Sequence, residues 1–266
     1  MEERRMIKLI VSDVDGTLVE DGSADLNPEL LDVILKLREK GIQFAIASGR
    51  PWSSVEHTFD PVKKKIFYIA NNGSYIGCHG RSLYTYTIDK ELAERVIRSV
   101  RRHPELEIVY ACAEGDYVDS KNEDLIRWLI DGYKFKLNRV DDLLELKEPP
   151  VKISIYKPDG IEEATRFVFD EFGTELKLAC AGDMWMDCMA LGVNKGNAVK
   201  TIQESLDIRP EETMAFGDQL NDLEMLDQAY YSFAVANARE EVRRAARFQA
   251  DSNVNDGVLK ILKYLL

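Results

Sequence analysis

The stretch IKLIVSDVDGTL, residues 7–18, decides the fold class expected for this chain. It opens with an apolar run, residues 7–11, of the kind found in strands buried on both faces of a helix-covered parallel sheet. Ligands of such sheets bind beyond the carboxyl ends of the strands. Asp13 and Asp15 follow the run at that end, and residues two apart in an extended segment point the same way. Two like charges facing one space predict a cation or a proton between them.

The composition limits the classes of partner. The 266 residues include 35 Lys and Arg against 47 Asp and Glu, a formal charge of −12. This excess repels nucleic acid and anionic membranes, so a phosphorylated ligand must be held by local positive charge. The start of the chain, MEERR in residues 1–5, leads directly into the first strand without a signal peptide or membrane helix. We therefore expect a cytoplasmic protein with no nucleic-acid or membrane partner, and no obligate protein partner is evident.

Cysteines and histidines are poor candidates for the chemistry. Cysteines stand at positions 78, 112, 180 and 188 without CxxC spacing, which predicts buried free thiols and neither a disulfide scaffold nor a zinc site. The histidines at positions 57, 79 and 103 form no paired ligand motif and lie beside no evident nucleophile. The carboxylates are therefore expected to carry the chemistry.

Strands and helices alternate at both ends of the chain. A helix is expected over residues 28–40, ending at Gly41, and strands over residues 42–47 and 65–70. The pattern resumes with helices at 196–206 and 222–228 and strands at 213–217 and 231–236. This alternation predicts an α/β, Rossmann-like, doubly wound parallel sheet.

The middle of the chain has a different character. Helices are expected over residues 89–102, 122–130 and 161–172, and strands over 106–111, 117–119, 151–156, 176–181 and 184–190, the last two joined at Gly182-Asp183. Paired strands beside helices indicate an α+β unit with an antiparallel sheet. We therefore expect a core of residues 1–82 and 191–266, interrupted by an insertion of residues 83–190. The acidic segment 141–150 is expected to be a surface element.

Four groups of polar residues fall at strand ends or helix starts and supply what phosphoryl transfer needs. Asp13 can attack phosphorus and form an acyl phosphate, and Asp15 can protonate the leaving oxygen and later deprotonate water. Ser48 offers a hydroxyl and Gly49 a backbone N–H to phosphoryl oxygens. Lys195, within GVNKG, supplies positive charge.

The fourth group, GDQLND in residues 217–222, adds carboxylates. Asp13, Asp218 and the backbone carbonyl of Asp15 would suit octahedral Mg2+, which would let an anionic nucleophile approach an anionic substrate. Each residue also has an ordinary interpretation, as a turn former, a helix cap or a solvated lysine. Those interpretations do not predict that all four groups share one edge of one sheet.

In this order, DVDGTL (13–18), SGR (48–50), GVNKG (192–196) and GDQLND (217–222) resemble the four motifs of the haloacid dehalogenase superfamily, and the order and the glycine-flanked lysine resemble its Cof-type phosphatase branch. NNG at 71–73 and the stretch 253–259 extend the resemblance to both ends of the chain. It implies a Rossmann-like core with a C2B-type cap inserted between the second and third motifs. The stretch AVANA, residues 234–238, departs from the more usual MGNA of this branch but keeps Asn237-Ala238.

The resemblance also implies roles for single residues. Asp13 would be the nucleophile and Asp15 the acid and base, while Ser48 and Lys195 would bind the substrate phosphate. Asp218 would bind the magnesium ion, Asn221 would lie near the phosphoryl group, and Asp222 would hold a metal-bound water.

A phosphatase of a small phosphorylated metabolite is the leading hypothesis, with a mobile cap that excludes water and selects the substrate. A phosphomutase of the same capped fold and a non-catalytic phosphate sensor are the alternatives. A receiver domain would not need an insertion of this size. By family likeness the substrate is expected to be a sugar phosphate, with pyridoxal phosphate, flavin-precursor phosphates and phosphoglycolate left open. Tyr84, Tyr86, Trp185 and Asp187 could contact the substrate, but packing within the cap is the expectation for each.

Overall fold

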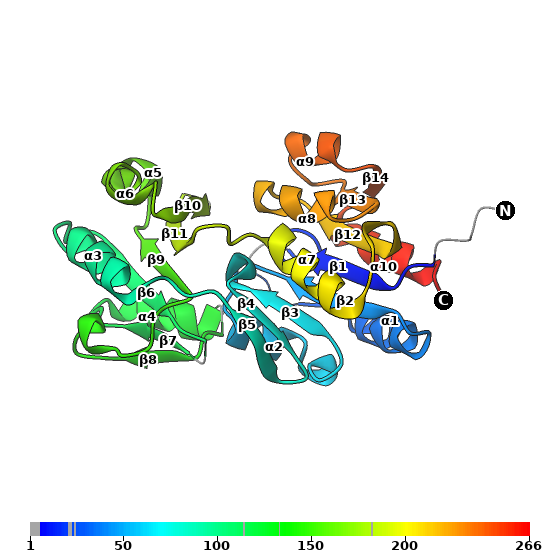
Figure 1. Ribbon diagram of the computed structural model, residues 1–266, viewed down its shortest axis with the longest axis horizontal. Coiled ribbons are helices and arrows are strands. Elements are labelled where there is room, and N and C mark those ends of the chain that lie inside the picture. The colour runs from blue at the N-terminus through cyan, green and yellow to red at the C-terminus, as the bar shows by residue number, and fades with distance from the viewer. Residues whose placement is uncertain (1–5, 21–22, 24, 114, 133, 182) are drawn as a thin grey trace. The chain divides into compact units, whose positions relative to one another are not determined.

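The computed structural model describes residues 6–20, 23, 25–113, 115–132, 134–181 and 183–266. The charged start of the chain, residues 1–5, and Gly182 of the expected hairpin turn lie outside the described residues. The chain divides into two compact units, whose helices and strands are labelled in Figure 1. Unit 1 comprises Met1–Leu83 and Asn194–Leu266, and unit 2 comprises Tyr84–Val193. The sequence predicts the junctions between core and insertion at 82/83 and 190/191, and the units meet at 83/84 and 193/194.

An eight-stranded sheet forms the centre of unit 1, in the order β14-β13-β12-β1-β2-β3-β4-β5. The pairings from β14 through to β3 are parallel, and β4 returns antiparallel to β3. The sequence prediction did not include β4, β5 or β14. The strands are β1 (Leu9–Asp13), β2 (Gln43–Ala47), β3 (Phe67–Ala70), β4 (Tyr75–Cys78), β5 (Arg81–Thr85), β12 (Thr213–Gly217), β13 (Tyr231–Val235) and β14 (Phe248–Ala250).

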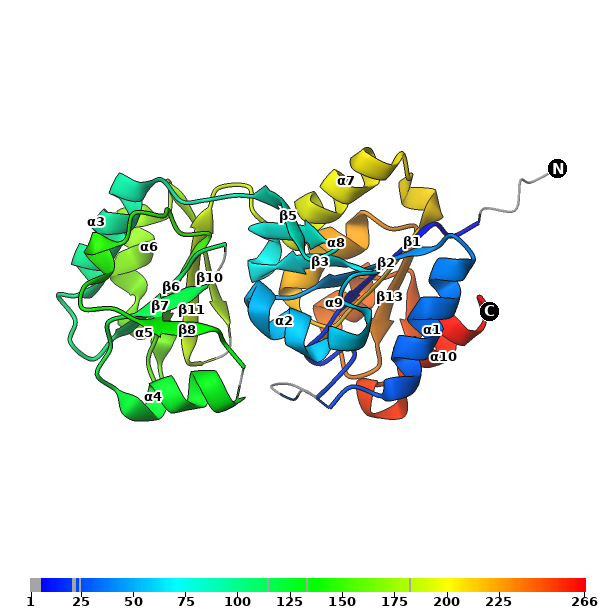
Figure 2. The ribbon, with the colours of Figure 1, turned by 90° about the horizontal axis from the view of Figure 1, so that it is seen from below.

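Helices cover both faces of this sheet. α1 packs against α10, α7 packs against α8, and the two pairs lie on opposite faces (Figure 2). The start of α1 follows from its sequence, because the side chain of Asn27 caps the helix by accepting from Glu29 N at 3.0 Å. The predicted Rossmann-like, doubly wound class is confirmed. The helices are α1 (Pro28–Glu39), α2 (Trp52–Thr58), α7 (Lys195–Leu206), α8 (Leu223–Asp227), α9 (Glu240–Ala245) and α10 (Gly257–Lys263).

Unit 2 is built on a six-stranded sheet in the order β10-β11-β9-β6-β7-β8. Its pairings are antiparallel except between β7 and β8, and β8 was not predicted. The helix expected over 161–172 breaks in two at Thr165. The elements are α3 (Lys90–Val100), β6 (Glu107–Ala111), β7 (Asp116–Val118), α4 (Glu123–Arg127), β8 (Leu137–Arg139), β9 (Lys152–Tyr156), α5 (Ile161–Ala164), α6 (Arg166–Phe172), β10 (Leu176–Ala181) and β11 (Trp185–Ala190).

The two faces of the unit 2 sheet carry separate apolar clusters, because successive side chains of a strand point to opposite faces. One cluster joins Ile108 and Ile155 to α3, α5 and α6. The other joins Val109 to α4, with the rings of Trp128, Tyr156 and Trp185 at its margin. This α+β arrangement is the one that the inserted segment was expected to adopt.

Three expectations of burial are wrong. Tyr84 and Tyr86 were expected to pack inside the cap, but they are 44% and 42% exposed. Tyr84 belongs to the edge strand β5, whose residues are exposed throughout. Cys180 is exposed, whereas the other three free cysteines are buried as expected. Among the helices that the structure describes, none is both long and apolar enough to cross a membrane.

Asp187 behaves as expected and packs within unit 2, in a group of buried polar side chains on the α4 face of the sheet. Its carboxylate accepts hydrogen bonds from Lys152 Nζ at 3.1 Å and from Ser154 Oγ at 2.6 Å. Asp116 lies on β7, only 1% exposed, and its Oδ2 has no hydrogen-bond partner among the residues that the structure describes. Burial raises the pKa of Asp116 to about 7, although the charge of Lys152 acts to lower it.

Asp116 is therefore expected to make stability depend on pH. Because its pKa is higher in the folded state than the ordinary value of 3.8, the folded state holds an extra proton between about pH 4 and pH 7. Stability should fall as the pH rises through this window, by at most about 1.4 kcal/mol for each pH unit. Asp116→Asn should make the fall smaller by the share that Asp116 contributes, as measured by urea unfolding at pH 4, 5.5 and 7. The control is Asp124→Asn, because the side chain of Asp124 is 95% exposed. If the free energy of unfolding of Asp116→Asn changed with pH as much as that of wild type, the expectation would be contradicted.

Candidate active site

Three neighbouring parallel strands bring Asp13, Ser48 and Asp218 to one edge of the unit 1 sheet. β12, β1 and β2 are adjacent, with Asp13 paired in register to Ala47 and Ser12 to Phe216. Asp13 is the last residue of β1, so the strand runs two residues beyond the run expected from the sequence. Ser48 directly follows β2, and Asp218 directly follows β12.

A buried ionic cluster lies at this edge. Lys195 is the first residue of α7, and its Nζ donates to Asp13 Oδ1 at 2.5 Å and to Asp222 Oδ1 at 2.7 Å. Lys195 is 1% exposed, Asp13 5% and Asp222 0%. These charges come from three distant parts of the chain, and the ion pairs between them hold α7 and the strand ends together.

The charges of the cluster do not balance. The carboxylates of Asp13, Asp218 and Asp222 can each place one oxygen within 4.8 Å of the others. With Lys195 this makes three negative charges against one positive charge, an excess of two. Burial and the charge of Asp222 accordingly raise the pKa of Asp13 well above its ordinary value, and the attraction of Lys195 does not offset them. Burial acts to lower the pKa of Lys195, but Asp13 and Asp222 outweigh it and raise the pKa, so this lysine is charged.

This donor set fits a magnesium ion. Mg2+ takes oxygen ligands, commonly one or two carboxylates with waters and phosphate oxygens, and a divalent cation would cancel the excess charge. Asp218 stands at this position because Thr17 Oγ1 donates to its Oδ1 at 2.8 Å. Gly16 also permits it, since a Cβ at residue 16 would lie 2.4 Å from Asp218 Oδ2 and φ there is +80°.

Asp222 organises the turn that follows β12. Its Oδ2 accepts from the backbone N–H groups of Asp218 and Gln219, at 2.9 and 3.0 Å, while its Oδ1 accepts from Lys195. Both oxygens are thus engaged within the protein. This geometry makes Asp222 an anchor for Lys195 and for the turn, and the expectation that it also holds a metal-bound water stays a prediction.

Asp15 lies outside the close group of three carboxylates and is bound by Arg50. Arg50 Nε donates to Asp15 Oδ2 at 2.8 Å, Arg50 Nη2 donates to Asp15 Oδ1, and Nη2 also donates to Ser23 O at 2.7 Å. The guanidinium is 7% exposed and the Asp15 side chain 25%. A bidentate salt bridge of this kind fixes the orientation of the carboxylate group. The sequence prediction gave Arg50 no role, although the residue stands in the SGR motif.

Ser48 and Asn221 occupy the two loops that flank Asp13. Ser48 is fully buried, and its Oγ accepts from Arg50 N at 3.0 Å. Asn221 is exposed, and its Nδ2 donates to Asn72 Oδ1 at 3.0 Å. Neither Asn72 nor Thr17 was assigned a role from the sequence, because their partners at positions 221 and 218 are distant along the chain.

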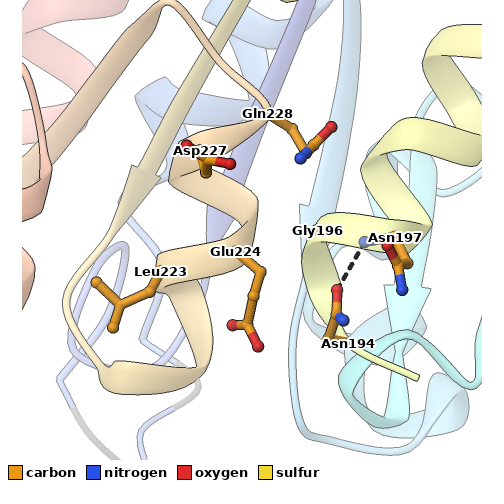
Figure 3. Close-up of a pocket in the computed structure, with 7 residues that line it drawn as sticks. All are labelled: Asn194, Gly196, Asn197, Leu223, Glu224, Asp227 and Gln228. Carbon is orange, nitrogen blue, oxygen red and sulfur yellow. Dashed lines mark hydrogen bonds between the residues drawn. The ribbon is translucent and has the colours of Figure 1, made fainter. Parts of the chain in front are cut away.

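A separate hollow of about 380 Å³ lies between α7 and α8 (Figure 3). Figure 3 shows Asn194 capping α7, where its Oδ1 accepts from Asn197 N at 2.7 Å. The described residues that line the hollow are Asn194, Gly196, Asn197, Leu223, Glu224, Asp227 and Gln228, and none of them belongs to the ionic cluster. The hollow contains two acidic side chains and no basic one, which does not suit a phosphate.

Comparisons with known proteins agree with this geometry. Residues 10–262 match the family model of haloacid dehalogenase-like hydrolases. The chain is 28% identical over 261 residues to the 5-amino-6-(5-phospho-D-ribitylamino)uracil phosphatase YbjI of Escherichia coli (strain K12), covering 98% of this chain and 96% of the relative. It is 26% identical over 262 residues to YcsE of Bacillus subtilis (strain 168), which has the same named activity. The match covers 97% of this chain and 95% of YcsE.

A crystal structure of a protein from Eubacterium rectale is similar throughout, with a TM-score of 0.91 and 38% identity over 98% of this chain and 100% of that one. The family model spans both units and all four motifs. The chain therefore belongs to the haloacid dehalogenase-like hydrolases.

Proposed function

We propose that this hydrolase is a Mg2+-dependent phosphatase that cleaves a small phosphorylated metabolite through an aspartyl-phosphate intermediate. As its named relatives indicate, the enzyme is a phosphoric monoester hydrolase. The observation that carries the finer proposal is the buried carboxylate of Asp13 beside Lys195, within a group of acidic residues that has an excess of negative charge.

In the proposed reaction, a carboxylate oxygen of Asp13 attacks phosphorus and the bond from phosphorus to the leaving oxygen breaks. Asp15, directed by Arg50, gives a proton to that oxygen and afterwards takes one from the water that releases phosphate. Lys195, Ser48, the N–H of Gly49 and Asn221 are proposed to hold the phosphoryl oxygens. Asp13, Asp218 and the backbone carbonyl of Asp15 would hold Mg2+, which neutralises charge when bound.

The substrate class proposed is a sugar phosphate. Two relatives that match nearly the full length of the chain are named for a substrate with a phosphorylated ribityl group, so we propose a phosphate on a sugar or sugar-derived alcohol. Selection of the substrate by unit 2 is part of the same proposal.

The test is phosphate release from p-nitrophenyl phosphate and from a panel containing hexose phosphates, 5-amino-6-(5-phospho-D-ribitylamino)uracil, pyridoxal phosphate and phosphoglycolate. Each is assayed with Mg2+ and with EDTA. We expect release only with Mg2+ and the highest kcat/KM for a sugar-derived phosphate. Transfer of phosphate between two hydroxyls of one sugar without release would favour a mutase, and binding without turnover would favour a sensor.

A further inference from the structure

The turn Asn71–Gly73, a motif without a role in the proposed reaction, contacts the loop that follows β2. Asn71 N donates to Arg50 O at 2.9 Å, and Asn72 N donates to Ser48 O at 3.0 Å. Asn71 and Asn72 have φ of +49° and +57°, in the left-handed region where asparagine is among the few side chains commonly found. The backbone of the turn is therefore tied to the Ser48 loop.

The side chain of Asn72 connects this loop to the one that follows β12. Its Oδ1 accepts from Asn221 Nδ2 at 3.0 Å, 149 residues further along the chain. Its amide lies against Gly49, where a Cβ would be 3.2 Å from Asn72 Oδ1. One side chain thus contacts residues of both loops proposed to hold phosphate.

The turn also touches the residue before Lys195. A Cβ at Gly73, where φ is +105°, would lie 2.4 Å from Asn194 O. The Asn71–Gly73 turn therefore meets the second, third and fourth motifs of the site.

Simple packing at the end of β3 does not account for the Asn72–Asn221 bond. β1 and β2 lie between β12 and β3, so the loops after β12 and β3 start about 14 Å apart, three strand spacings. They meet across the ends of the strands that carry Asp13 and Ser48. A bond at that place fixes the distance between the two loops that flank the nucleophile.

We propose that Asn72 is a positioning residue for phosphoryl transfer, holding Asn221 in register with the loop of Ser48 and Gly49. The inference rests on the proposed function, because that function assigns the phosphate to these residues. Loss of the bond lets Asn221 move, and small errors in placement reduce the rate of the chemical step more than substrate binding.

The experiment is a double-mutant cycle of Asn72→Gly and Asn221→Ala. Glycine removes the side chain while it tolerates the left-handed backbone. We expect each single variant to lower kcat/KM for p-nitrophenyl phosphate on the order of tenfold, mainly through kcat, and the double variant to be no slower than the slower single variant. The matched control is Asp207→Gly, an exposed left-handed residue at the end of α7, which should keep wild-type activity.

Two results would overturn the inference: wild-type kcat in Asn72→Gly, or losses that multiply in the double variant. A purely structural role would lower the unfolding midpoint without coupling the two positions. For wild type, both single variants and the double variant, the affinity for inorganic phosphate is also measured, by calorimetry in the presence of Mg2+. A wild type that binds phosphate but turns over no substrate contradicts the proposed phosphatase, and the phosphate cycle then decides the role of Asn72 by itself.

Discussion

Asp13→Asn is expected to abolish phosphate release, lowering kcat with any substrate on the order of 10⁴-fold or more. The amide has the shape of the carboxylate but cannot form the acyl phosphate. The same change should not lower stability in the absence of metal, because burial and Asp222 already make an ionised Asp13 unfavourable. Loss of activity with retained stability is the pattern of a nucleophile and not of a structural residue.

The measurements are steady-state kinetics with Mg2+ and thermal unfolding in EDTA. Asp207→Asn serves as the control, since this exposed residue also has a left-handed backbone that asparagine accepts. Turnover by Asp13→Asn within tenfold of wild type would contradict the role of Asp13. A large drop in its unfolding midpoint would mean that the ion pair with Lys195 outweighs the excess charge.

Lys195→Met is expected to lower both activity and stability. The change leaves Asp13 and Asp222 buried without their cation, and breaking a buried pair costs roughly 3–5 kcal/mol. Chemical unfolding in EDTA measures this loss of free energy of unfolding. Lys200→Met on the same helix, with a side chain 61% exposed, should change stability little.

The charge explanation has its own test in the double variant Lys195→Met with Asp13→Asn. The three carboxylates and one ammonium of the wild type carry a net charge of −2; Lys195→Met makes it −3, and the double variant restores −2. The double variant should therefore be more stable than Lys195→Met. If it is less stable, packing around the lysine stem, and not its charge, explains the loss.

The sequence was sufficient for the fold class and for the edge of the sheet at which the candidate site residues lie. Apolar runs ending in polar residues predicted the parallel strands β1, β2 and β12, and parallel strands place their carboxyl ends at one edge. The strands β8 and β14 escaped prediction because three residues carry little pattern, although β7, which is equally short, was predicted. β5 was missed because its residues are exposed and show no apolar alternation.

Roles within the site were harder to predict, because they depend on partners distant in the sequence. The motif containing Arg50 was recognised, but its pairing with Asp15 depends on how the loops after β1 and β2 meet. Asp222 was recognised as part of a motif, but its use by Lys195 and by two backbone N–H groups depends on the turn after β12.

The sequence by itself determined the alternation of the longer strands and helices, the α+β character of the inserted segment and the candidate nucleophile, because these follow from local periodicity and from motifs of a few residues. Only the tertiary structure decided how the charged and polar side chains are paired: Lys195 with Asp13 and Asp222, Arg50 with Asp15, and Asn72 with Asn221. The physical reason is that a side chain's partner depends on which loops come together across the end of the sheet, and that contact is set by the packing of the whole unit.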